Sequence, residues 1–314
     1  MKKLFLLIFT LLPLLLVAKE EQIVLHTPTG DIYGTLLLPD SPLPVPVTLI
    51  IAGSGPTDRN GNSPLLQSPN NSLKYLAEEL EQNGIASLRF DKRGIGESKV
   101  AMVKEDDLRF DTYIDDVKLW IQLLSKDKRL SSITIAGHSE GSLIGIIASA
   151  ASKKVKSFVS IAGTALPADE IIKEQISAQP KPVQDMVFPA LDTLKQGKLV
   201  RNVSPALYSL LRPSVQPYMI SWMQYDPCKE LSKLTIPILI VQGTTDIQIP
   251  VYHAEMLVAA NKGAEKQIIE SMNHVLKPCT STDKMEQMTT YTAPDLPLAE
   301  KLIPAIVEFI VKHK

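Results

Sequence analysis

Ser139 is the residue whose type and surroundings most clearly indicate chemistry. It lies in the stretch Gly137-His138-Ser139-Glu140-Gly141, where a β-branched apolar run ends and a run of small residues with helical character begins. A G-x-S-x-G pentapeptide at a strand-to-helix turn is typical of a nucleophile elbow, which lifts a serine hydroxyl above a sheet. Such a turn is too tight for side chains at its two glycine positions. We therefore predict that Ser139 is a nucleophile; an ordinary glycine-rich turn is the alternative.

A nucleophilic serine needs a general base, and the base needs an acid that orients it. Of the five histidines, only His274 is expected in a loop at the carboxyl end of a strand. His138 lies inside the elbow, where its side chain is expected to point away from the Ser139 hydroxyl, and His253 opens a predicted helix. Asp246 follows the preceding strand, so the chain order Ser139, Asp246, His274 is the one expected of a triad on an α/β sheet. The alternatives are a helix-capping Asp246 and a solvent-exposed His274.

The elements that must position these residues alternate between apolar strands and helical patterns. This alternation predicts an α/β fold, with a mostly parallel central sheet flanked by helices and a two-stranded antiparallel start. A continuous apolar run such as 47–52 indicates a strand that is covered on both faces. The predicted strands are 22–26, 32–38, 47–52, 85–90, 132–136, 155–161, 236–241 and 266–269, and the predicted helices are 71–83, 111–125, 143–152, 252–261 and 298–311.

Residues 164–230 break this rhythm. They contain several prolines, scattered methionines and aromatic residues, and no β-branched run. We predict short helices here, inserted between two strands of the sheet as a helical cap that lies over the site. The core is then expected in two parts, residues 19–163 and residues 231–314.

The first 18 residues predict a secretory signal. Two lysines precede an apolar run of about 15 residues, which is shorter than the roughly 20 residues that a membrane-spanning helix needs. We expect cleavage after Ala18 and a secreted or periplasmic mature chain without a stable membrane span. An uncleaved N-terminal anchor is the alternative.

Composition restricts the expected partners and sites. The 314 residues carry a formal net charge of −1 without any basic block, so nucleic acid is not an expected partner. The two cysteines, Cys228 and Cys279, form no C-x-x-C pair and no His/Cys cluster, which argues against a metal site. In an oxidising compartment they could form a disulfide near the catalytic loop. Two separate thiols are the alternative.

Several segments resemble those of the α/β-hydrolase superfamily, over essentially the whole mature chain. Besides the elbow, they are DKRGIGES at 91–98, GTTDIQIP at 243–250 and MNH at 272–274. The loop AGSGPTDRNG at 52–61 is similar, more narrowly, to the loop of a group of bacterial esterases with a helical cap. The resemblance implies hydrolysis of small-molecule carboxylic esters, usually with short acyl chains, and no cofactor.

The resemblance also implies an oxyanion hole. Many members of the superfamily carry His-Gly where this chain has Ala52-Gly53. A main-chain donor does not depend on the preceding side chain, so the N–H of Ser54 is still expected to serve. The second expected donor is the N–H of Glu140, which the turn aims, together with the start of the following helix, at charge that develops beside Ser139.

The leading hypothesis is a serine esterase that works through an acyl-enzyme intermediate. A serine peptidase of the same fold is the first alternative, because the same triad cleaves amides. The esterase-like glycine loop and the absence of a propeller-like repeat argue against it. A catalytically inert binding protein of this fold is the second alternative, and the intact set of Ser139, Asp246 and His274 argues against that. We expect acyl and alcohol selectivity to reside in side chains of the cap.

Overall fold

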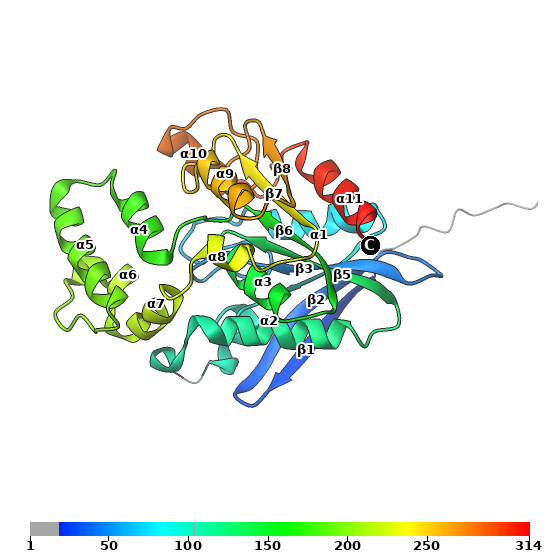
Figure 1. Cartoon of the computed structure of the whole chain (residues 1–314), viewed down its shortest axis with the longest axis horizontal. Helices are drawn as coiled ribbons and strands as arrows, with labels where there is room; N and C mark the ends of the chain where they lie inside the picture. The colour runs from blue at the N-terminus through cyan, green and yellow to red at the C-terminus, as the bar shows by residue number, and fades with distance from the viewer. Residues whose placement is uncertain (1–18, 103) are drawn as a thin grey trace, which may run out of the picture.

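The computed structural model describes residues 19–102 and 104–314. The predicted secretory signal lies outside these residues. Within them, no helix combines the length and the apolar character needed to cross a membrane. The described residues form one sheet of eight strands in the order β1-β2-β4-β3-β5-β6-β7-β8 (Figure 1). The strands are β1 (Lys19–Thr27), β2 (Gly30–Leu38), β3 (Val45–Ile51), β4 (Ala86–Phe90), β5 (Leu130–His138), β6 (Val155–Ile161), β7 (Ile238–Gly243) and β8 (Ala264–Ile269).

The sheet is mostly parallel, which confirms the sequence-based prediction. The pairs from β4 through β3, β5, β6 and β7 to β8 are all parallel, whereas β2 runs antiparallel to both of its neighbours, β1 and β4. β4 and β7 are buried along their whole length, as expected of strands that are covered on both faces. The ends of β3, β5, β7 and β8 meet at one edge of the sheet, and each predicted site residue follows one of these ends.

Helices cover both faces of this sheet, as Figure 1 shows. Because side chains alternate along a strand, Ile50 packs in the apolar layer that contains α1 and α11, while its neighbour Leu49 packs in the layer that contains α2, α3 and α9. The covering helices are α1 (Ser72–Gln82), α2 (Phe110–Leu124), α3 (Glu140–Ala150), α9 (Val251–Ala260) and α11 (Leu302–Lys312). The two layers hold the strands rigidly, so the loops after the strand ends are presented from a fixed base.

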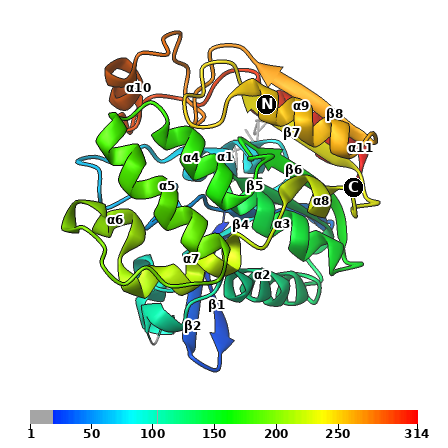
Figure 2. The ribbon, with the colours of Figure 1, turned by 60° about the vertical axis from the view of Figure 1, so that its left-hand side comes forward.

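A helical insertion separates β6 from β7. Its helices are α4 (Ala168–Ile176), α5 (Lys181–Lys195), α6 (Tyr208–Leu211), α7 (Gln216–Trp222) and α8 (Pro227–Leu231). Figures 1 and 2 show α4 to α7 grouped at one side of the molecule, next to the sheet. α7 packs on α2 through aromatic rings, since Trp222 stacks on Phe110 with 5.9 Å between the ring centroids. That this insertion closes over the site as a cap stays a prediction.

The sequence-based prediction omits α10 (Lys284–Thr290), which lies between β8 and α11. A helix of seven residues is too short to show an apolar period. Its start can nevertheless be read from Asp283, whose carboxylate accepts the N–H groups of Met285 (2.9 Å) and Glu286 (3.1 Å). An Asp followed three residues later by a Glu is a known signal for a helix start.

Both cysteines are free thiols. The Cys228 thiol donates to the carbonyl oxygen of Ala165 at 3.4 Å, and the Cys279 thiol donates to that of Ser281, also at 3.4 Å. The disulfide considered from the sequence is therefore wrong for this structure, and the alternative of two separate thiols holds. Two cysteines in an oxidising compartment permit a bridge, but sequence does not tell whether the fold brings the sulfur atoms together.

Candidate active site

Ser139 occupies the turn between β5 and α3. Its backbone angles are φ 54° and ψ −121°, and a positive φ is uncommon for a residue with a side chain. A Cβ atom at Gly137 would lie 2.3 Å from the carbonyl oxygen of Gly141, and one at Gly141 would lie 2.4 Å from that of Ile51. Both clashes are with backbone, which cannot swing away as a side chain can. The tight strand-turn-helix geometry that the two glycines predict is therefore present.

The helix behind this turn begins at Glu140, three residues earlier than the sequence predicts. The strained conformation of Ser139 reverses the chain within a single residue, so the next residue is already helical. The N–H of Ser139 donates to the carbonyl oxygen of Ile161 at the end of β6 (2.9 Å), which fixes the turn to the neighbouring strand. The positive end of the α3 dipole consequently lies beside the Ser139 hydroxyl.

His274 and Asp246 are joined by a short hydrogen bond. His274 Nδ1 lies 2.8 Å from Asp246 Oδ2, and both side chains are buried. Because a carboxylate only accepts, Nδ1 carries the proton and Nε2 is left as the acceptor. Burial by itself raises the pKa of the Asp246 carboxyl, but the nearby His274, together with the main-chain N–H donors of Ile249 and Gln248, holds the pKa below its ordinary value.

The Asp246 carboxylate is held by three further donors. Its Oδ1 accepts the N–H groups of Gln248 (2.8 Å) and Ile249 (2.9 Å), and its Oδ2 accepts Gln242 Nε2 at 3.0 Å. The Gln242 amide also donates to the carbonyl oxygen of Ile249 at 2.7 Å. Gln242 therefore fixes the orientation of the carboxylate from inside β7. Sequence analysis misses this residue, because a glutamine at a strand end has no distinctive pattern.

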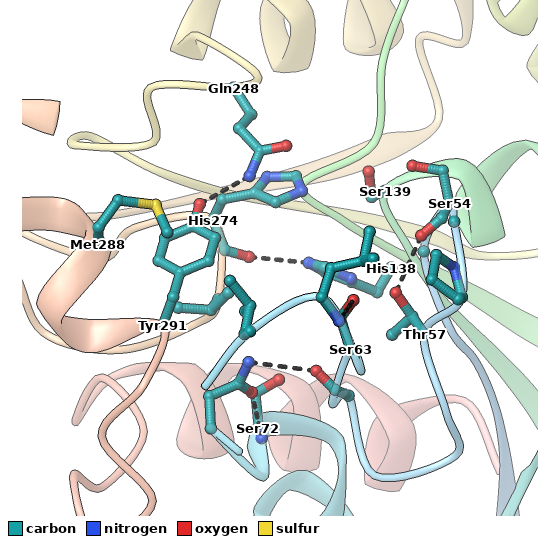
Figure 3. A pocket seen from close by; sticks show the side chains of 18 residues that line it. Ser54, Thr57, Ser63, Ser72, His138, Ser139, Gln248, His274, Met288 and Tyr291 are labelled. Carbon is teal, nitrogen blue, oxygen red and sulfur yellow. Dashed lines mark hydrogen bonds between the residues drawn. The ribbon is translucent and has the colours of Figure 1, made fainter. Parts of the chain in front are cut away.

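Ser139 and His274 line the same pocket, which has a volume of about 390 Å³. Figure 3 shows the His274 ring next to Ser139. The apolar part of the wall consists of Leu65, Leu66, Val275, Met288 and Tyr291. Among the described residues, no Asp, Glu, Lys or Arg side chain lines this pocket, and no group of three or more His, Cys, Asp or Glu could hold a metal ion.

Two main-chain N–H groups next to Ser139 are free to bind a ligand. Ser54 lines the pocket from the loop after β3, and Glu140 is the first residue of α3. In residues 19–102 and 104–314, neither N–H donates to any main-chain or side-chain acceptor. Two N–H groups without a partner in the chain, beside one hydroxyl, are suited to bind negative charge there.

Residues 70–227, half of the chain, match the Hydrolase_4 family, which is described as serine aminopeptidase, S33. The chain belongs to this family. The matched stretch contains the elbow and most of the helical insertion but not Asp246 or His274. The assignment of these two residues therefore depends on the geometry given above.

A curated relative of this Hydrolase_4 chain is esterase EstD of Thermotoga maritima. The two sequences are 26% identical over 249 residues, which cover 77% of this chain and 57% of the relative. The chain thus spans a little over half of the relative's length.

Solved structures confirm that this Hydrolase_4 chain has the α/β-hydrolase fold. Est1E of Butyrivibrio proteoclasticus, solved with ferulic acid, superposes with a TM-score of 0.62 at 18% identity, over 93% of this chain and 98% of that one. The α/β-hydrolase GrgF of Penicillium sp. sh18 superposes with a TM-score of 0.59 at 16% identity, over 94% of this chain and 99% of that one. At these identities the likeness supports the fold alone.

His138 has a place in the site that the sequence analysis did not assign to it. Its ring lines the pocket (Figure 3), and its Nε2 donates to the carbonyl oxygen of His274 at 2.8 Å. A carbonyl only accepts, so Nε2 carries the proton and the ring is neutral with a bare Nδ1. Burial, followed by the nearby His274, lowers the pKa of His138 to about 4. His138 therefore stays uncharged at neutral pH and holds the main chain of the His274 loop.

The remaining histidines lie elsewhere, as the sequence predicts. His253 is fully buried, and its Nδ1 accepts the N–H of Ala165 at 3.1 Å, so it holds the chain that leaves β6. His26 pairs with Asp31, and His313 lies 3.3 Å from Glu265, both at the surface. None of these three lines the pocket, which leaves His274 as the histidine bonded to a buried carboxylate.

The insertion does not line the pocket that holds Ser139, so selectivity from side chains of the cap stays a prediction. No residue of 164–230 lines the pocket; its walls come instead from residues 53–72, from Gln248, from the His274 loop and from Met288 and Tyr291 at α10. The insertion has a separate cavity of about 180 Å³ between α5 and α6, lined by residues such as Met186 and Leu211. The side chains that line the pocket beside Ser139 thus belong largely to two segments that sequence patterns leave undefined.

Proposed function

We propose that the chain is a serine hydrolase that cleaves carboxylic esters through an acyl-enzyme. One observation carries the proposal: Ser139, on its strained turn, shares a pocket with His274, whose Nδ1 is bonded to the buried Asp246. A hydroxyl and a bare imidazole nitrogen in one pocket, with a carboxylate bonded to the same imidazole, can act as a nucleophile, a base and an orienting acid.

In the first step, Ser139 Oγ attacks the ester carbonyl carbon and its proton passes to His274 Nε2. The imidazolium is stabilised by Asp246, which keeps its negative charge. The carbonyl oxygen becomes an oxyanion, which the N–H groups of Ser54 and Glu140 bind. The bond to the alcohol oxygen then breaks, and His274 Nε2–H protonates the leaving alcohol.

In the second step, water replaces the alcohol. His274 Nε2 takes a proton from the water, whose oxygen attacks the acyl carbon and forms a second oxyanion at the same two N–H groups. The bond to Ser139 Oγ breaks, the proton returns to Oγ, and the carboxylic acid leaves. Every proton is carried by His274, so the reaction requires no cofactor.

The uncharged pocket wall favours an ester over the substrate of an aminopeptidase. An aminopeptidase must bind the α-ammonium group of its substrate, and a carboxylate is the usual partner for such a group. In the described part of the chain, no carboxylate lines the pocket. The volume of about 390 Å³ lies at the small end of ligand sites, which suits a short acyl chain. The name of the relative EstD agrees with this proposal.

A serine peptidase is the second candidate, because the family description names an aminopeptidase. Purified protein should hydrolyse p-nitrophenyl esters of two to six carbons at least about a hundredfold faster than aminoacyl p-nitroanilides. The reverse preference would replace the esterase proposal with the peptidase.

A fluorophosphonate probe separates both enzymes from an inert binding protein, because it reacts only with an activated serine. Ser139→Ala should abolish labelling and reduce ester turnover at least about 10⁴-fold, and His274→Ala should be similarly damaging. Ser142→Ala is the matched control. That serine lies three residues along and bonds Ser160 Oγ at 2.7 Å, so its loss should leave labelling unchanged. Labelling that survives Ser139→Ala would contradict the proposal.

We also propose that the chain is exported through its first 18 residues, on the strength of their two lysines and apolar run. N-terminal sequencing of protein from the producing cell tests this. A mature chain that begins at Lys19 is the expected result, and a retained Met1 would contradict cleavage.

A further inference from the structure

Lys92 is a buried charged residue for which the proposed mechanism has no use. It follows β4, and its side chain is 2% exposed. Its Nζ donates to the carbonyl oxygen of Gly53 at 2.7 Å and to Glu140 Oε1 at 2.9 Å, and it lies 4.9 Å from the centroid of the Tyr113 ring. Burying an ammonium group is strongly unfavourable unless its partners compensate for the lost water, so the two partners of Lys92 indicate what the group is for.

The two hydrogen-bond partners of Lys92 adjoin the two proposed oxyanion donors. The Gly53 carbonyl belongs to the same peptide group as the Ser54 N–H, and Glu140 supplies the other N–H from its own main chain. A single ammonium group therefore binds both segments that must converge on the oxyanion. No other described residue makes hydrogen bonds to both Gly53 and Glu140.

The peptide geometry determines where the Ser54 N–H points. The described chain contains no cis peptide bond, so the carbonyl and the N–H of the 53–54 peptide point in opposite directions. Lys92 holds the carbonyl on the inner side, and the N–H is thereby directed away from Lys92. The peptide also lies against the nucleophile, since a Cβ atom at Gly53 would be only 3.2 Å from Ser139 Cβ.

The positive charge of Lys92 also favours binding of an oxyanion by the two N–H groups. A hydrogen bond from an ammonium group polarises the Gly53 carbonyl and makes the N–H of the same peptide a stronger donor. The ion pair also neutralises the Glu140 carboxylate, which would otherwise oppose a developing oxyanion near its own N–H. Both the position and the strength of the two donors therefore depend on this ammonium group.

We propose that Lys92 is a positioning residue of the oxyanion hole, which holds the Gly53–Ser54 peptide and the start of α3 in the orientation that binds the oxyanion. The inference rests on the proposed ester hydrolysis. It predicts that loss of the ammonium group weakens binding of the tetrahedral intermediate and leaves binding of the ground-state ester almost unchanged.

The test compares two variants that differ only at Lys92. Glu140→Gln keeps the ammonium group, its bond to the Gly53 carbonyl and an amide oxygen for it to bind. Lys92→Met/Glu140→Gln removes the ammonium group without leaving an unpaired charge. If this double variant unfolds by circular dichroism, Lys92→Met/Glu140→Met takes its place, because that pair is apolar and similar in volume, and Glu140→Met is then its reference.

The kcat of Glu140→Gln itself is the baseline of the comparison, because Glu140 belongs to the proposed oxyanion hole and its variant is not expected to match the wild type. The double variant should lose a further tenfold to hundredfold in kcat while KM changes less than about threefold; complete loss of one donor would cost about 10²–10³. A trifluoromethyl ketone, which forms a tetrahedral adduct with the serine, should lose affinity by the same factor as kcat/KM.

Equal kcat in the two variants would overturn the inference, and so would a loss confined to KM. These outcomes are distinct from failure of the proposed function. If the wild type neither hydrolyses esters nor reacts with a fluorophosphonate, the proposed function and the role of Lys92 both fall. If the wild type is active, the comparison concerns Lys92 alone.

Discussion

The Asp246→Asn substitution is the most informative perturbation of the proposed triad, because the contacts of Asp246 determine how the new amide lies. Oδ1 accepts two main-chain N–H groups at 2.8 and 2.9 Å, so the amide oxygen must stay there. The amide nitrogen then takes the place of Oδ2, where it faces His274 Nδ1 and Gln242 Nε2. A nitrogen that carries two hydrogens cannot accept from either of them.

The histidine must consequently change its tautomer. His274 Nδ1 becomes an acceptor for the amide, the proton moves to Nε2, and the ring can no longer take a proton from Ser139. We expect kcat to fall by about 10⁴, or about 5 kcal/mol of transition-state stabilisation, with KM almost unchanged. The fold should lose only about 1–2 kcal/mol, because the donor Gln242 Nε2 is left facing another donor.

Stopped-flow hydrolysis of p-nitrophenyl acetate measures this loss, and urea unfolding measures the change in stability. Asp116→Asn is the matched control: Asp116 is also buried and binds the Arg93 guanidinium through both oxygens at 2.6 Å. Asp116→Asn should lower the free energy of unfolding more than Asp246→Asn does, while its kcat stays within a few-fold of the wild-type value. An Asp246→Asn enzyme that keeps more than about a tenth of wild-type kcat would refute the reasoning about the tautomer.

Three further predictions concern stability, thiols and selectivity. His138 keeps a pKa of about 4 when folded against 6.5 when unfolded, so the unfolded state binds more protons between these values. The free energy of unfolding should reach its full value above about pH 6.5 and be about 2 kcal/mol lower at about pH 5. Urea unfolding at these two pH values measures the difference, which should be smaller in His138→Asn than in the wild type. Thiol titration of unfolded, unreduced protein should find both Cys228 and Cys279 free, and one thiol or none would contradict the structure. Met288→Ala should raise kcat/KM for hexanoyl relative to acetyl esters about tenfold, whereas Leu207→Ala, in the cavity of the insertion, should not change that ratio.

The positions of the strands could be predicted from the sequence, because each strand is an apolar run that ends at a turn. The predicted strand over 155–161 coincides with β6, and most other predicted strands agree with the structure within a few residues. Apolar β-branched runs form buried strands whatever lies beyond them. The parallel sheet then brings Ser139, Asp246 and His274 to one edge, so that chain order alone was enough to group them.

The walls of the pocket could not be predicted in the same way. Met288 lies in α10, a short helix without an apolar period, Tyr291 directly follows this helix, and Leu65 and Leu66 come from a loop. Their proximity to Ser139 depends on contacts between segments about 70 to 150 residues apart in the chain. For the same reason the insertion, which the sequence suggested as the source of selectivity, contributes no side chain to this pocket.

By itself, the sequence determined which residue is held on a strained turn and which strands present the other two members of the candidate triad. The turn requires glycine at positions 137 and 141, and each buried strand requires an apolar run before its loop. These are local requirements of backbone geometry and burial, so they can be recognised in the sequence alone. Only the tertiary structure decided that Lys92 joins the Gly53 carbonyl to Glu140, and that His138 holds the His274 loop. A lysine in a loop and a histidine in a turn are ordinary in sequence; their roles arise from burial beside groups that the fold alone brings within hydrogen-bonding distance.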